Sequence, residues 1–366
     1  MNYNVFHIVS DKVWTGTCQQ VYDLVSKMRH DDRFYVEVVC KKHDAVLKHF
    51  RRLEVPVSIL PLKGLTDIDS PVRLAEMLRT GRNVVHVHNF SDAFLAVWAR
   101  RISGNRNTRV IATIHTISKP RSNYLFNRIY RALDGVVFVS DLTSRHYLEA
   151  CPRLNPEKCR VIRDSVFWPE PMPDAPAVPD LRHQLDLLPG QALLMYHGRV
   201  NHDKGVDVLL RAVTQLDKSS YHLMILGEGQ PKFMSQIKAF IVANQLLRNV
   251  TLAGFKEQVL RHIEQCDIGI VPSVMPEAMG LSCLEYMMCG KALITTGNGA
   301  QREYIRHREN GVLVPPDNYK AIASALKVLI DNPDLRAEMG QRAAEDFDNS
   351  LAYDRYYTDM TDLYLR

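Results

Sequence analysis

The sequence predicts an α/β protein with two doubly wound domains, each built on a parallel sheet with crossover helices. Short apolar, β-branched runs alternate with helical patterns along the chain, as they do in parallel sheets. Residues 168–180 hold five prolines, a density that excludes helix and favours an extended connector. A chain of 366 residues suggests about two domains, one on each side of this connector.

We place the first domain at residues 1–168. Helical stretches such as Gln19–Arg29 and Arg73–Arg79 fall between its strands. Ligands of doubly wound sheets bind at the carboxyl ends of strands, so the residues that directly follow strands are the candidate site residues. The six expected strands of this half are Val5–Val9, Val36–Cys40, Val57–Leu60, Val84–His88, Val110–Ile114 and Val136–Val139.

Three residues of the first half draw interest because they follow strands. Gly16 lies in the loop after the first strand and permits close approach of the backbone to a ligand phosphate. His88 ends the fourth strand, and His115 comes directly after the fifth. A histidine at a strand end is either a hydrogen-bonded structural group or a chemical one, and both interpretations stay open at this point.

The second domain, which we place at residues 169–349, contains a loop with two acidic residues. The strand Ile268–Val271 ends at Pro272, and Glu277 lies in the loop that follows. A helix is expected from Leu281 to Cys289, with Glu285 about one turn inside it. Gly280, Leu281 and Ser282 form the helix start, where unpaired backbone amides and the helix dipole favour an anion.

Two cations follow another strand of this half, Ala192–His197. Arg199 and Lys204 come after it in a glycine-containing loop. A diphosphate needs two cations at a fixed separation, with Arg for bidentate contact and Lys as a point charge. Further strands are expected at Leu223–Leu226 and Ala292–Thr296. These residues therefore predict a site for a phosphorylated, polyhydroxy ligand at the carboxyl ends of the strands.

Charge and cysteine usage give weaker indications of partners and location. Residues 1–168 hold 26 Lys and Arg against 16 Asp and Glu, a net charge of +10, and the rest of the chain has a net charge of −5. The basic half fits an anionic acceptor or an anionic membrane surface, or else carries scattered solvated charge. Seven cysteines without a C-x-x-C pair fit free thiols. The start of the chain reads as a strand rather than a signal peptide, and no run of about 18 apolar residues occurs, so we expect a cytoplasmic protein.

Three further features have competing interpretations. Cys283 is either a small filler or a nucleophile, and filling is favoured. Asp67-Ile68-Asp69 is read as a solvated loop rather than a metal site, and no other metal-ligand cluster is recognised in the sequence. The stretch Lys119–Leu133 is basic and amphipathic, so it is either a helix that lies on anionic lipid or an ordinary sheet-covering helix.

Several of these motifs together resemble the retaining glycosyltransferases of the GT-B fold, in particular family 4. Glu277 and Glu285 have the spacing of that family's E-x7-E element, and Arg199 and Lys204 match its donor-site cations. The chain departs from the pattern in the first half, where Asp164-Ser165 stand in place of Asn-Gly. Other matching segments contain His88, His115, Gly227, Phe255 and residues 310–315, in the family's order.

The resemblance implies a role for each matching residue. Arg199 and Lys204 would stabilise the departing diphosphate, Glu277 would contact the donor sugar, and Glu285 would hold the ribose. His115 would approach the sugar from the first domain. The remaining implied donor-binding residues are Gly16, Gly227, Phe255, Gly280, Leu281 and Ser282.

The resemblance also implies a function and an architecture. The expected activity is retaining, metal-independent transfer of a hexosyl-type sugar from a UDP or GDP sugar, with no cofactor. The acceptor would be a glycan or lipid-linked molecule in bacterial surface polysaccharide synthesis, met by a cytoplasmic or peripheral membrane enzyme. The final helical stretch, Ser350–Leu365, would belong to a segment 350–366 that packs on the first domain. The alternatives are a 2-epimerase of nucleotide sugars and a non-catalytic nucleotide-binding regulator.

Overall fold

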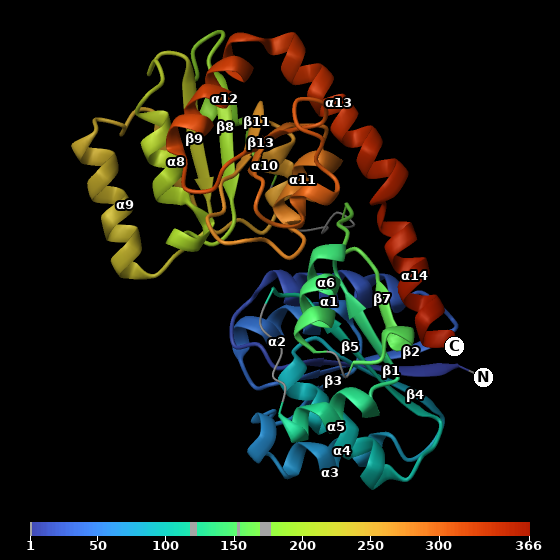
Figure 1. Cartoon of the computed structure of the whole chain (residues 1–366). Helices are drawn as coiled ribbons and strands as arrows, with labels where there is room; N and C mark the ends of the chain where they lie inside the picture. Colours follow the sequence, from blue (N-terminus) through green and yellow to red (C-terminus); the bar gives the residue numbers. More distant parts are fainter. Residues whose placement is uncertain (1, 118–122, 152–153, 169–176) are drawn as a thin grey trace. The chain divides into compact units, whose positions relative to one another are not determined.

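The computed structural model describes residues 2–117, 123–151, 154–168 and 177–366 (Figure 1). The chain divides into two compact units. Unit 1 comprises residues 1–165 and 353–366, and unit 2 comprises residues 166–352. The expected boundaries, at 168 and 349, each differ from these by three residues. Most of the proline-rich connector, residues 169–176, lies outside the described residues.

Unit 1 contains a seven-stranded sheet in the order β3-β2-β1-β4-β5-β6-β7, and all its neighbouring strands are parallel. The strand order reverses between β1 and β4, which makes the crevice beyond their carboxyl ends the switch point of the sheet. All six predicted strands are present. The seventh is a three-residue, partly exposed edge strand with no apolar run to mark it. The strands are β1 Tyr3–Val9, β2 Phe34–Cys40, β3 Val57–Ile59, β4 Arg82–Val87, β5 Thr108–Ile114, β6 Gly135–Phe138 and β7 Cys159–Val161.

Helices cover both faces of the unit 1 sheet, with α3, α4 and α5 on one face and α1 and α6 on the other (Figure 1). Phe6 and Ile8 of β1 pack in the core beneath α3 and α4. The last helix, α14, packs on the same unit, where the Tyr357 hydroxyl donates a 2.7 Å hydrogen bond to Asp31. The helices are α1 Gly16–Met28, α2 Asp44–Phe50, α3 Asp69–Met77, α4 Ala93–Ser103, α5 Tyr124–Ala132, α6 Asp141–Ala150 and α14 Tyr353–Leu365.

Unit 2 contains a six-stranded parallel sheet in the order β10-β9-β8-β11-β12-β13. Its switch point lies between β8 and β11. The strands are β8 Ala192–His197, β9 Tyr221–Leu226, β10 Val250–Gly254, β11 Ile268–Val271, β12 Ala292–Thr296 and β13 Val312–Val314. The helices are α7 Leu181–Gln184, α8 Val206–Val213, α9 Pro231–Ala243, α10 Val259–Ile263, α11 Leu281–Met288, α12 Tyr319–Asp331 and α13 Pro333–Ser350.

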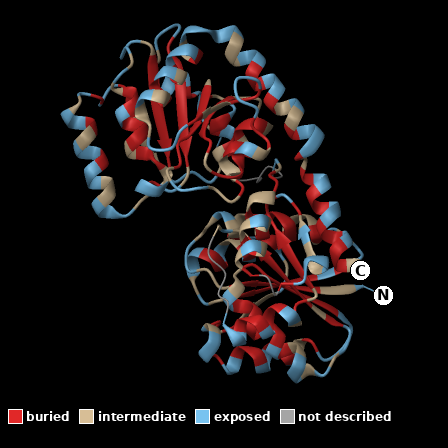
Figure 2. Cartoon of the chain, in the orientation of Figure 1, coloured by how far each residue is buried: buried red, intermediate tan, exposed pale blue. Residues whose placement is uncertain are grey.

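The central strands of unit 2 are buried along their whole length, as expected for a parallel sheet with helices on both faces (Figure 2). Gly269 of β11 lets α11 pack closely on this sheet, because a Cβ there would come within 2.4 Å of the Tyr286 ring. The close packing fixes α11, and with it the helix start that follows the Glu277 loop.

One local prediction in unit 1 has a clear outcome. The interpretation of Asp67 as part of a solvated loop is wrong, because this carboxylate is buried and bonds to Ser70 in the first turn of α3. It accepts hydrogen bonds from the Ser70 hydroxyl at 2.6 Å, the Ser70 amide at 3.0 Å and the Lys63 amide at 2.8 Å. At another helix start of this unit, Ser140 caps α6 and accepts a hydrogen bond from the Thr143 amide at 3.1 Å.

Candidate active site

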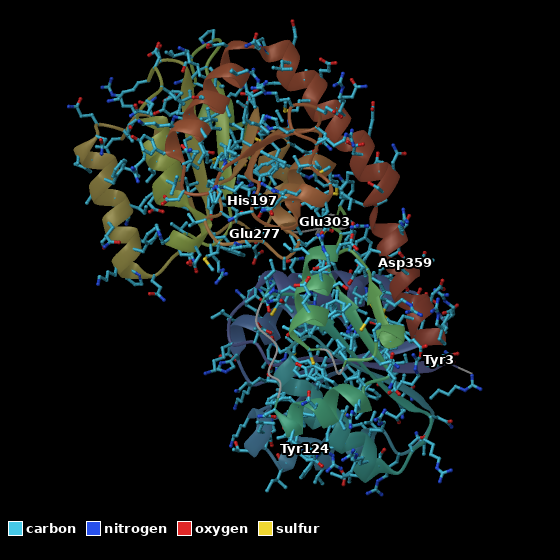
Figure 3. All side chains as sticks on the ribbon, viewed as in Figure 1. Tyr3, Tyr124, His197, Glu277, Glu303 and Asp359 are labelled. Carbon is cyan, nitrogen blue, oxygen red and sulfur yellow. The ribbon has the colours of Figure 1, made fainter. Side chains whose placement is uncertain are left out.

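The predicted donor residues of unit 2 gather at its switch point. The loop after β8 carries Arg199 and Lys204, and the loop after β11 carries Glu277 and leads into α11. His197 and Glu277, both labelled in Figure 3, mark these two segments. A site at the carboxyl ends of β8 and β11 is where an open parallel sheet places its ligand.

The two loops are held together by backbone contacts. The amides of Val274 and Met275 donate to the Asp203 carbonyl at 2.9 and 3.1 Å. Gly205 has a φ of 70°, and a Cβ there would lie 2.0 Å from the Pro272 carbonyl oxygen. The glycine is therefore required both by its left-handed backbone and by the approach of the second loop. This arrangement fixes the position of Lys204 beside the Glu277 loop.

Lys204 and Glu277 form a direct ion pair, with 2.5 Å between Lys204 Nζ and Glu277 Oε1. The Ser273 hydroxyl donates to the same oxygen at 2.5 Å. Both charged side chains are partly buried, with 27% of Lys204 and 16% of Glu277 exposed, which strengthens their attraction relative to a surface pair. Ser273 was missed in the sequence, although it follows β11 by two residues and precedes Glu277 by four.

Glu285 is held by a partner from β8. His197 Nε2 lies 2.5 Å from Glu285 Oε2, and His197 Nδ1 lies 3.0 Å from the Tyr286 hydroxyl. That hydroxyl donates to the Met195 carbonyl at 2.8 Å, so its oxygen accepts from His197 Nδ1–H. His197 was missed in the sequence analysis, although it ends a strand directly before Gly198.

The predicted anion site lies at the start of α11. Gly280 precedes the helix with a φ of 87°. The first helical hydrogen bond runs from the Cys283 amide to the Gly280 carbonyl at 2.9 Å, so the amides of Leu281 and Ser282 come before it. The Ser282 hydroxyl also contacts the His197 carbonyl at 3.4 Å. Helix α11 is eight residues long. The amides at its start, next to Lys204, favour the binding of a phosphate group.

Three other predicted residues lie around these loops. Arg199 is exposed, and its carbonyl accepts the Tyr196 hydroxyl at 2.6 Å. Phe255 follows β10 and is 52% exposed. Gly227 packs against the loop after β8, because a Cβ there would lie 1.9 Å from the Gly198 carbonyl oxygen. That packing already requires a glycine at position 227, whether or not the residue contacts a donor.

Cys283 lies inside α11 and is completely buried. Burial raises the pKa of its thiol to about 12. The protonated thiol is a poor nucleophile, since the thiolate is the reactive form. These facts favour its interpretation as a packing residue.

The histidines of unit 1 form a hydrogen-bonded chain. His115 Nδ1 lies 3.3 Å from Asp164 Oδ2, and His115 Nε2 lies 3.2 Å from His88 Nδ1. His88 Nε2 in turn lies 3.1 Å from His7 Nδ1. Both ring nitrogens of His115 thus have protein partners, so contact with a sugar would require one of them to be released. Gly16, the other predicted residue of this unit, is the first residue of α1, after the capping Thr15.

His86 completes a buried cluster with His7 and His88, whose ring nitrogens approach within 4.8 Å of one another. Its two nitrogens lie 2.6 Å from the Thr113 and Tyr364 hydroxyls. Burial lowers the pKa of His7 to about 3 and the pKa of the other two well below their usual value, so all three are neutral. Hydrogen bonds already engage both nitrogens of His86, and the expectation of a metal-free protein stays a prediction.

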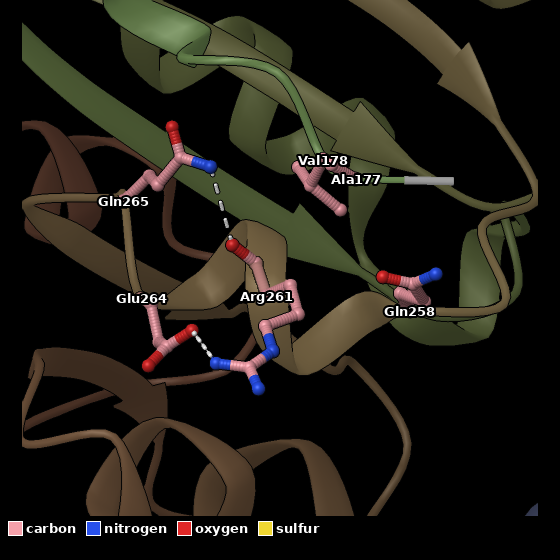
Figure 4. Close-up of a pocket in the computed structure, with 6 residues that line it drawn as sticks. All are labelled: Ala177, Val178, Gln258, Arg261, Glu264 and Gln265. Carbon is pink, nitrogen blue, oxygen red and sulfur yellow. Dashed lines mark hydrogen bonds and ion pairs between the residues drawn. The ribbon is translucent and has the colours of Figure 1, made fainter. Parts of the chain in front are cut away.

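A separate hollow of about 320 Å³ lies beside α10 (Figure 4). Arg261 and Glu264 form an ion pair on its wall at 3.1 Å, and the Gln265 side chain contacts the Arg261 carbonyl at 3.4 Å. The Gln265 amide also donates to the Pro179 carbonyl at 3.1 Å, which ties the end of the connector to this helix. None of the predicted donor residues lines this hollow, so it is not the candidate site.

Comparison with known proteins gives two family matches that together span most of the chain. The family Glycosyltransferase Family 4 matches residues 14–166, and the family Glycosyl transferases group 1 matches residues 178–346. The chain is 29% identical over 153 residues to the uncharacterized glycosyltransferase MJ1178 of Methanocaldococcus jannaschii, a match that covers 41% of this chain and 42% of that protein.

Two longer similarities extend this result. The chain is 27% identical over 274 residues to a phosphatidyl-myo-inositol mannosyltransferase of Mycobacterium leprae, covering 72% of this chain and 68% of that protein. The fold of the present chain matches the crystal structure of Anabaena Alr3699/HepE in complex with UDP, with a TM-score of 0.83, 16% identity and 99% coverage of both chains. Two parallel α/β units with this similarity confirm the predicted fold class, two Rossmann-like domains of the GT-B type.

Proposed function

The chain belongs to the GT-B glycosyltransferases of group 1, and from this premise we propose the reaction that it catalyses. The enzyme transfers a hexosyl-type sugar from a nucleotide-diphosphate sugar, with retention of anomeric configuration, to a glycan or lipid-linked acceptor. The observation that carries the proposal is the Lys204–Glu277 ion pair beside the start of α11. It puts a cation, free helix amides and a carboxylate within one site.

The site offers separate groups for each part of such a donor. The diphosphate binds the amides of Leu281 and Ser282 together with Lys204 and the exposed Arg199. As Lys204 turns to the diphosphate, Glu277 is released to accept hydrogen bonds from sugar hydroxyls. Glu285, held through one oxygen by His197, keeps its other oxygen for the ribose.

Catalysis then rests on charge stabilisation. Negative charge develops on the leaving diphosphate, and preorganised cations and amides stabilise it without a divalent metal. Glu277 supports the positive charge that develops on the sugar. His115, if one of its two hydrogen bonds opens, contributes a contact to the sugar. Full activity in EDTA is expected, and complete dependence on a metal ion would contradict this mechanism.

The donor and the acceptor class are supported by the similar proteins. The structure of HepE contains UDP, which supports a UDP-type donor here. The mannosyltransferase of Mycobacterium leprae is named for a phosphatidyl-inositol acceptor, which supports a lipid-linked acceptor. The net charge of +10 in residues 1–168, from 26 Lys and Arg against 16 Asp and Glu, fits an acceptor in surface polysaccharide synthesis that is presented at an anionic membrane.

Contact with an anionic membrane surface is part of the proposal. Among the described helices, none is long and apolar enough to cross a membrane. On α5, Tyr124 is 75% and Leu125 is 40% exposed, and the exposed Arg128 and Arg131 lie on the same helix. Phe126 and other apolar residues of α5 pack on the sheet, while Lys119 and Arg121 of the predicted amphipathic stretch lie outside the described residues. Flotation with anionic but not neutral vesicles would support this contact.

The donor assignment can be tested by thermal stabilisation with UDP, GDP, ADP and their sugars. A ligand at 100 times its Kd stabilises the folded protein by about 2.7 kcal/mol. One nucleotide should raise the Tm of the wild type and of Lys238→Ala, whose lysine is exposed on α9. The same nucleotide should raise the Tm of Lys204→Ala much less. Equal stabilisation of all three proteins would contradict the donor site.

A further inference from the structure

A second polar cluster lies at the switch point of unit 1, where β1 and β4 end side by side. Ser10 and Asp11 follow β1, and Asn89 and Asp92 follow β4. The cluster occupies in unit 1 the place that the donor residues occupy in unit 2. An open parallel sheet binds its ligand at this crevice, so the position itself points to a ligand.

The rim of the cluster is fixed by hydrogen bonds. Asn89 Nδ2 donates to Asp11 Oδ2 at 2.8 Å and to Ser10 Oγ at 3.2 Å. Thr15 Oγ1, at the cap of α1, donates to Asp11 Oδ1 at 3.4 Å. Both oxygens of Asp11 therefore have donors within the protein. Ser10, Asp11 and Asn89 are only partly buried, so they form a preorganised edge that solvent can reach.

Asp92 differs from Asp11 because it lacks a full set of donors. Its side chain is 1% exposed, and its Oδ2 is buried without a hydrogen-bond partner among the residues that the structure describes. A buried carboxylate oxygen without a donor is costly, and buried polar atoms in native proteins almost always have one. No side chain or backbone group among the described residues supplies a donor to Asp92 Oδ2, so this oxygen can accept from a bound ligand.

We propose that Ser10, Asp11, Asn89 and Asp92 form the acceptor site, and that it takes a neutral, hydroxyl-bearing ring one of whose hydroxyls donates a hydrogen bond to Asp92 Oδ2. The inference rests on the proposed transferase function, because it assigns the acceptor side of that reaction. Asp92 is here a binding residue that positions the acceptor, and Asn89 holds the rim that the ring contacts.

The chemistry of the cluster selects a neutral group over a phosphate. The carboxylate of Asp11 repels an anion, while Asp92 Oδ2 can accept a hydrogen bond from a neutral hydroxyl. The nearby cation, Lys41, contacts the Leu62 carbonyl at 3.4 Å. The switch point of unit 2 has the opposite character, with two cations and a helix start. Any phosphate or lipid portion of the acceptor would therefore lie away from Asp92.

The titration of Asp92 agrees with an unfilled acceptor position. Burial raises the pKa of the Asp92 carboxyl to about 7, with a further contribution from the charge of Asp11, and contacts with Ser10 oppose the shift. The carboxylate thus lacks the donors that would hold its pKa near the ordinary value of 3.8.

Saturation-transfer NMR on the full chain can test the site without a donor. The probes are myo-inositol and methyl α-mannopyranoside as neutral rings, and myo-inositol 1-phosphate and glucose 6-phosphate as anionic ones. Saturable binding of at least one neutral ring to the wild type is expected. Asp92→Leu should weaken it by about tenfold, since about 1.4 kcal/mol corresponds to that factor. Asn89→Ala should weaken it as well.

The matched control is Asp32→Asn, which removes an exposed carboxylate just before β2. This residue lies at the amino-terminal ends of the strands, whereas the proposed site lies at their carboxyl ends. It should bind like the wild type. Tighter binding of a phosphorylated probe, equal binding by Asp92→Leu and the wild type, or no saturable binding of either neutral ring would overturn the proposal. Nucleotide stabilisation measured on the same variants should be unchanged. If no nucleotide stabilises even the wild type, the donor site is refuted instead of the acceptor site. The two failures are therefore distinguishable.

Discussion

The two switch points of the molecule share a topology but differ in chemistry. At β8 and β11 of unit 2, Lys204 is paired with Glu277 next to the amides that open α11. At β1 and β4 of unit 1, Ser10, Asp11 and Asn89 form the partly exposed edge, and Asp92 Oδ2 has no hydrogen-bond partner among the described residues. The same backbone arrangement thus offers cations to an anion in one unit and carboxylates to hydroxyls in the other. Fold alone does not determine which ligand a parallel sheet takes.

The units also differ in how they bury ionisable groups. Unit 2 pairs acids with bases at its site, as in His197–Glu285. Unit 1 buries three neutral histidines side by side, linked to His115 and Asp164 by a chain of hydrogen bonds. The first arrangement can exchange its partners when a charged donor binds. The second requires that His7, His86 and His88 stay uncharged, because burial lowers their pKa values, and this ties the stability of unit 1 to pH.

The largest expected effect concerns the cationic switch point. Lys204→Ala and Glu277→Gln should each lower kcat/KM for transfer by about 10²–10³-fold, as the loss of one preorganised charged group does in other enzymes. Steady-state kinetics with the nucleotide sugar identified by thermal stabilisation would measure this. Lys238→Ala is the control and should keep wild-type kinetics. Near-normal turnover by either variant with an unchanged Tm would show that the comparison assigns the wrong residues to unit 2.

A pair of glycines tests how tightly each unit is built. Gly205 and Gly104 both adopt the left-handed backbone conformation, with φ of 70° and 66°. A Cβ at 205 would lie 2.0 Å from the Pro272 carbonyl oxygen, while a Cβ at 104 meets nothing within 4 Å. Gly205→Ala should therefore cost about 3 kcal/mol in the free energy of unfolding, and Gly104→Ala about 1 kcal/mol. Urea denaturation measures both, and equal costs would contradict the close approach of the two loops.

A smaller effect should separate the units by pH. His7 has a folded-state pKa of about 3 against 6.5 for the free group, so the unfolded chain binds more protons between these values. Its contribution to stability is present above pH 6.5 and is lost as the pH falls toward 3. Between pH 6.5 and 5 the loss is about 2 kcal/mol, at about 1.4 kcal/mol per unit. The lowered pKa values of His86 and His88 act in the same direction.

Tryptophan fluorescence can follow this loss, because Trp14 and Trp98 both belong to unit 1. Urea midpoints of the wild type should fall as the pH drops from 6.5 to 5, and His7→Asn should flatten this dependence, whatever its stability at pH 8. A slope that is unchanged in the variant would show that His7 is not buried and neutral.

The fold of unit 2 and the places of its candidate donor residues could be predicted because their signals are local. Ile268–Val271 and Ala292–Thr296 were predicted with the observed bounds, since a buried parallel strand reads as a short apolar run. The spacing of Glu277 and Glu285 is likewise contained in ten residues. The fold class is confirmed, while the roles of these residues stay predictions.

Contacts between distant segments could not be predicted in the same way. His7 and His88 meet only because β1 pairs with β4, and nothing near residue 7 indicates that pairing. Asp67 looked solvated because no strand ends directly on it, yet its carboxylate is buried and bonds to Ser70 in the first turn of α3. His197 and Ser273 carry no motif of their own, and their role follows from the side chains that they hold in place.

A crystal structure of the protein soaked with UDP, or with whichever nucleotide stabilises it most, would show directly whether the start of α11 binds the diphosphate. The account predicts diphosphate density against the amides of Leu281 and Ser282, with Lys204 turned from Glu277 toward the phosphates. Diphosphate density at the carboxylates of unit 1, or bound nucleotide with the Lys204–Glu277 pair intact and the start of α11 empty, would contradict it.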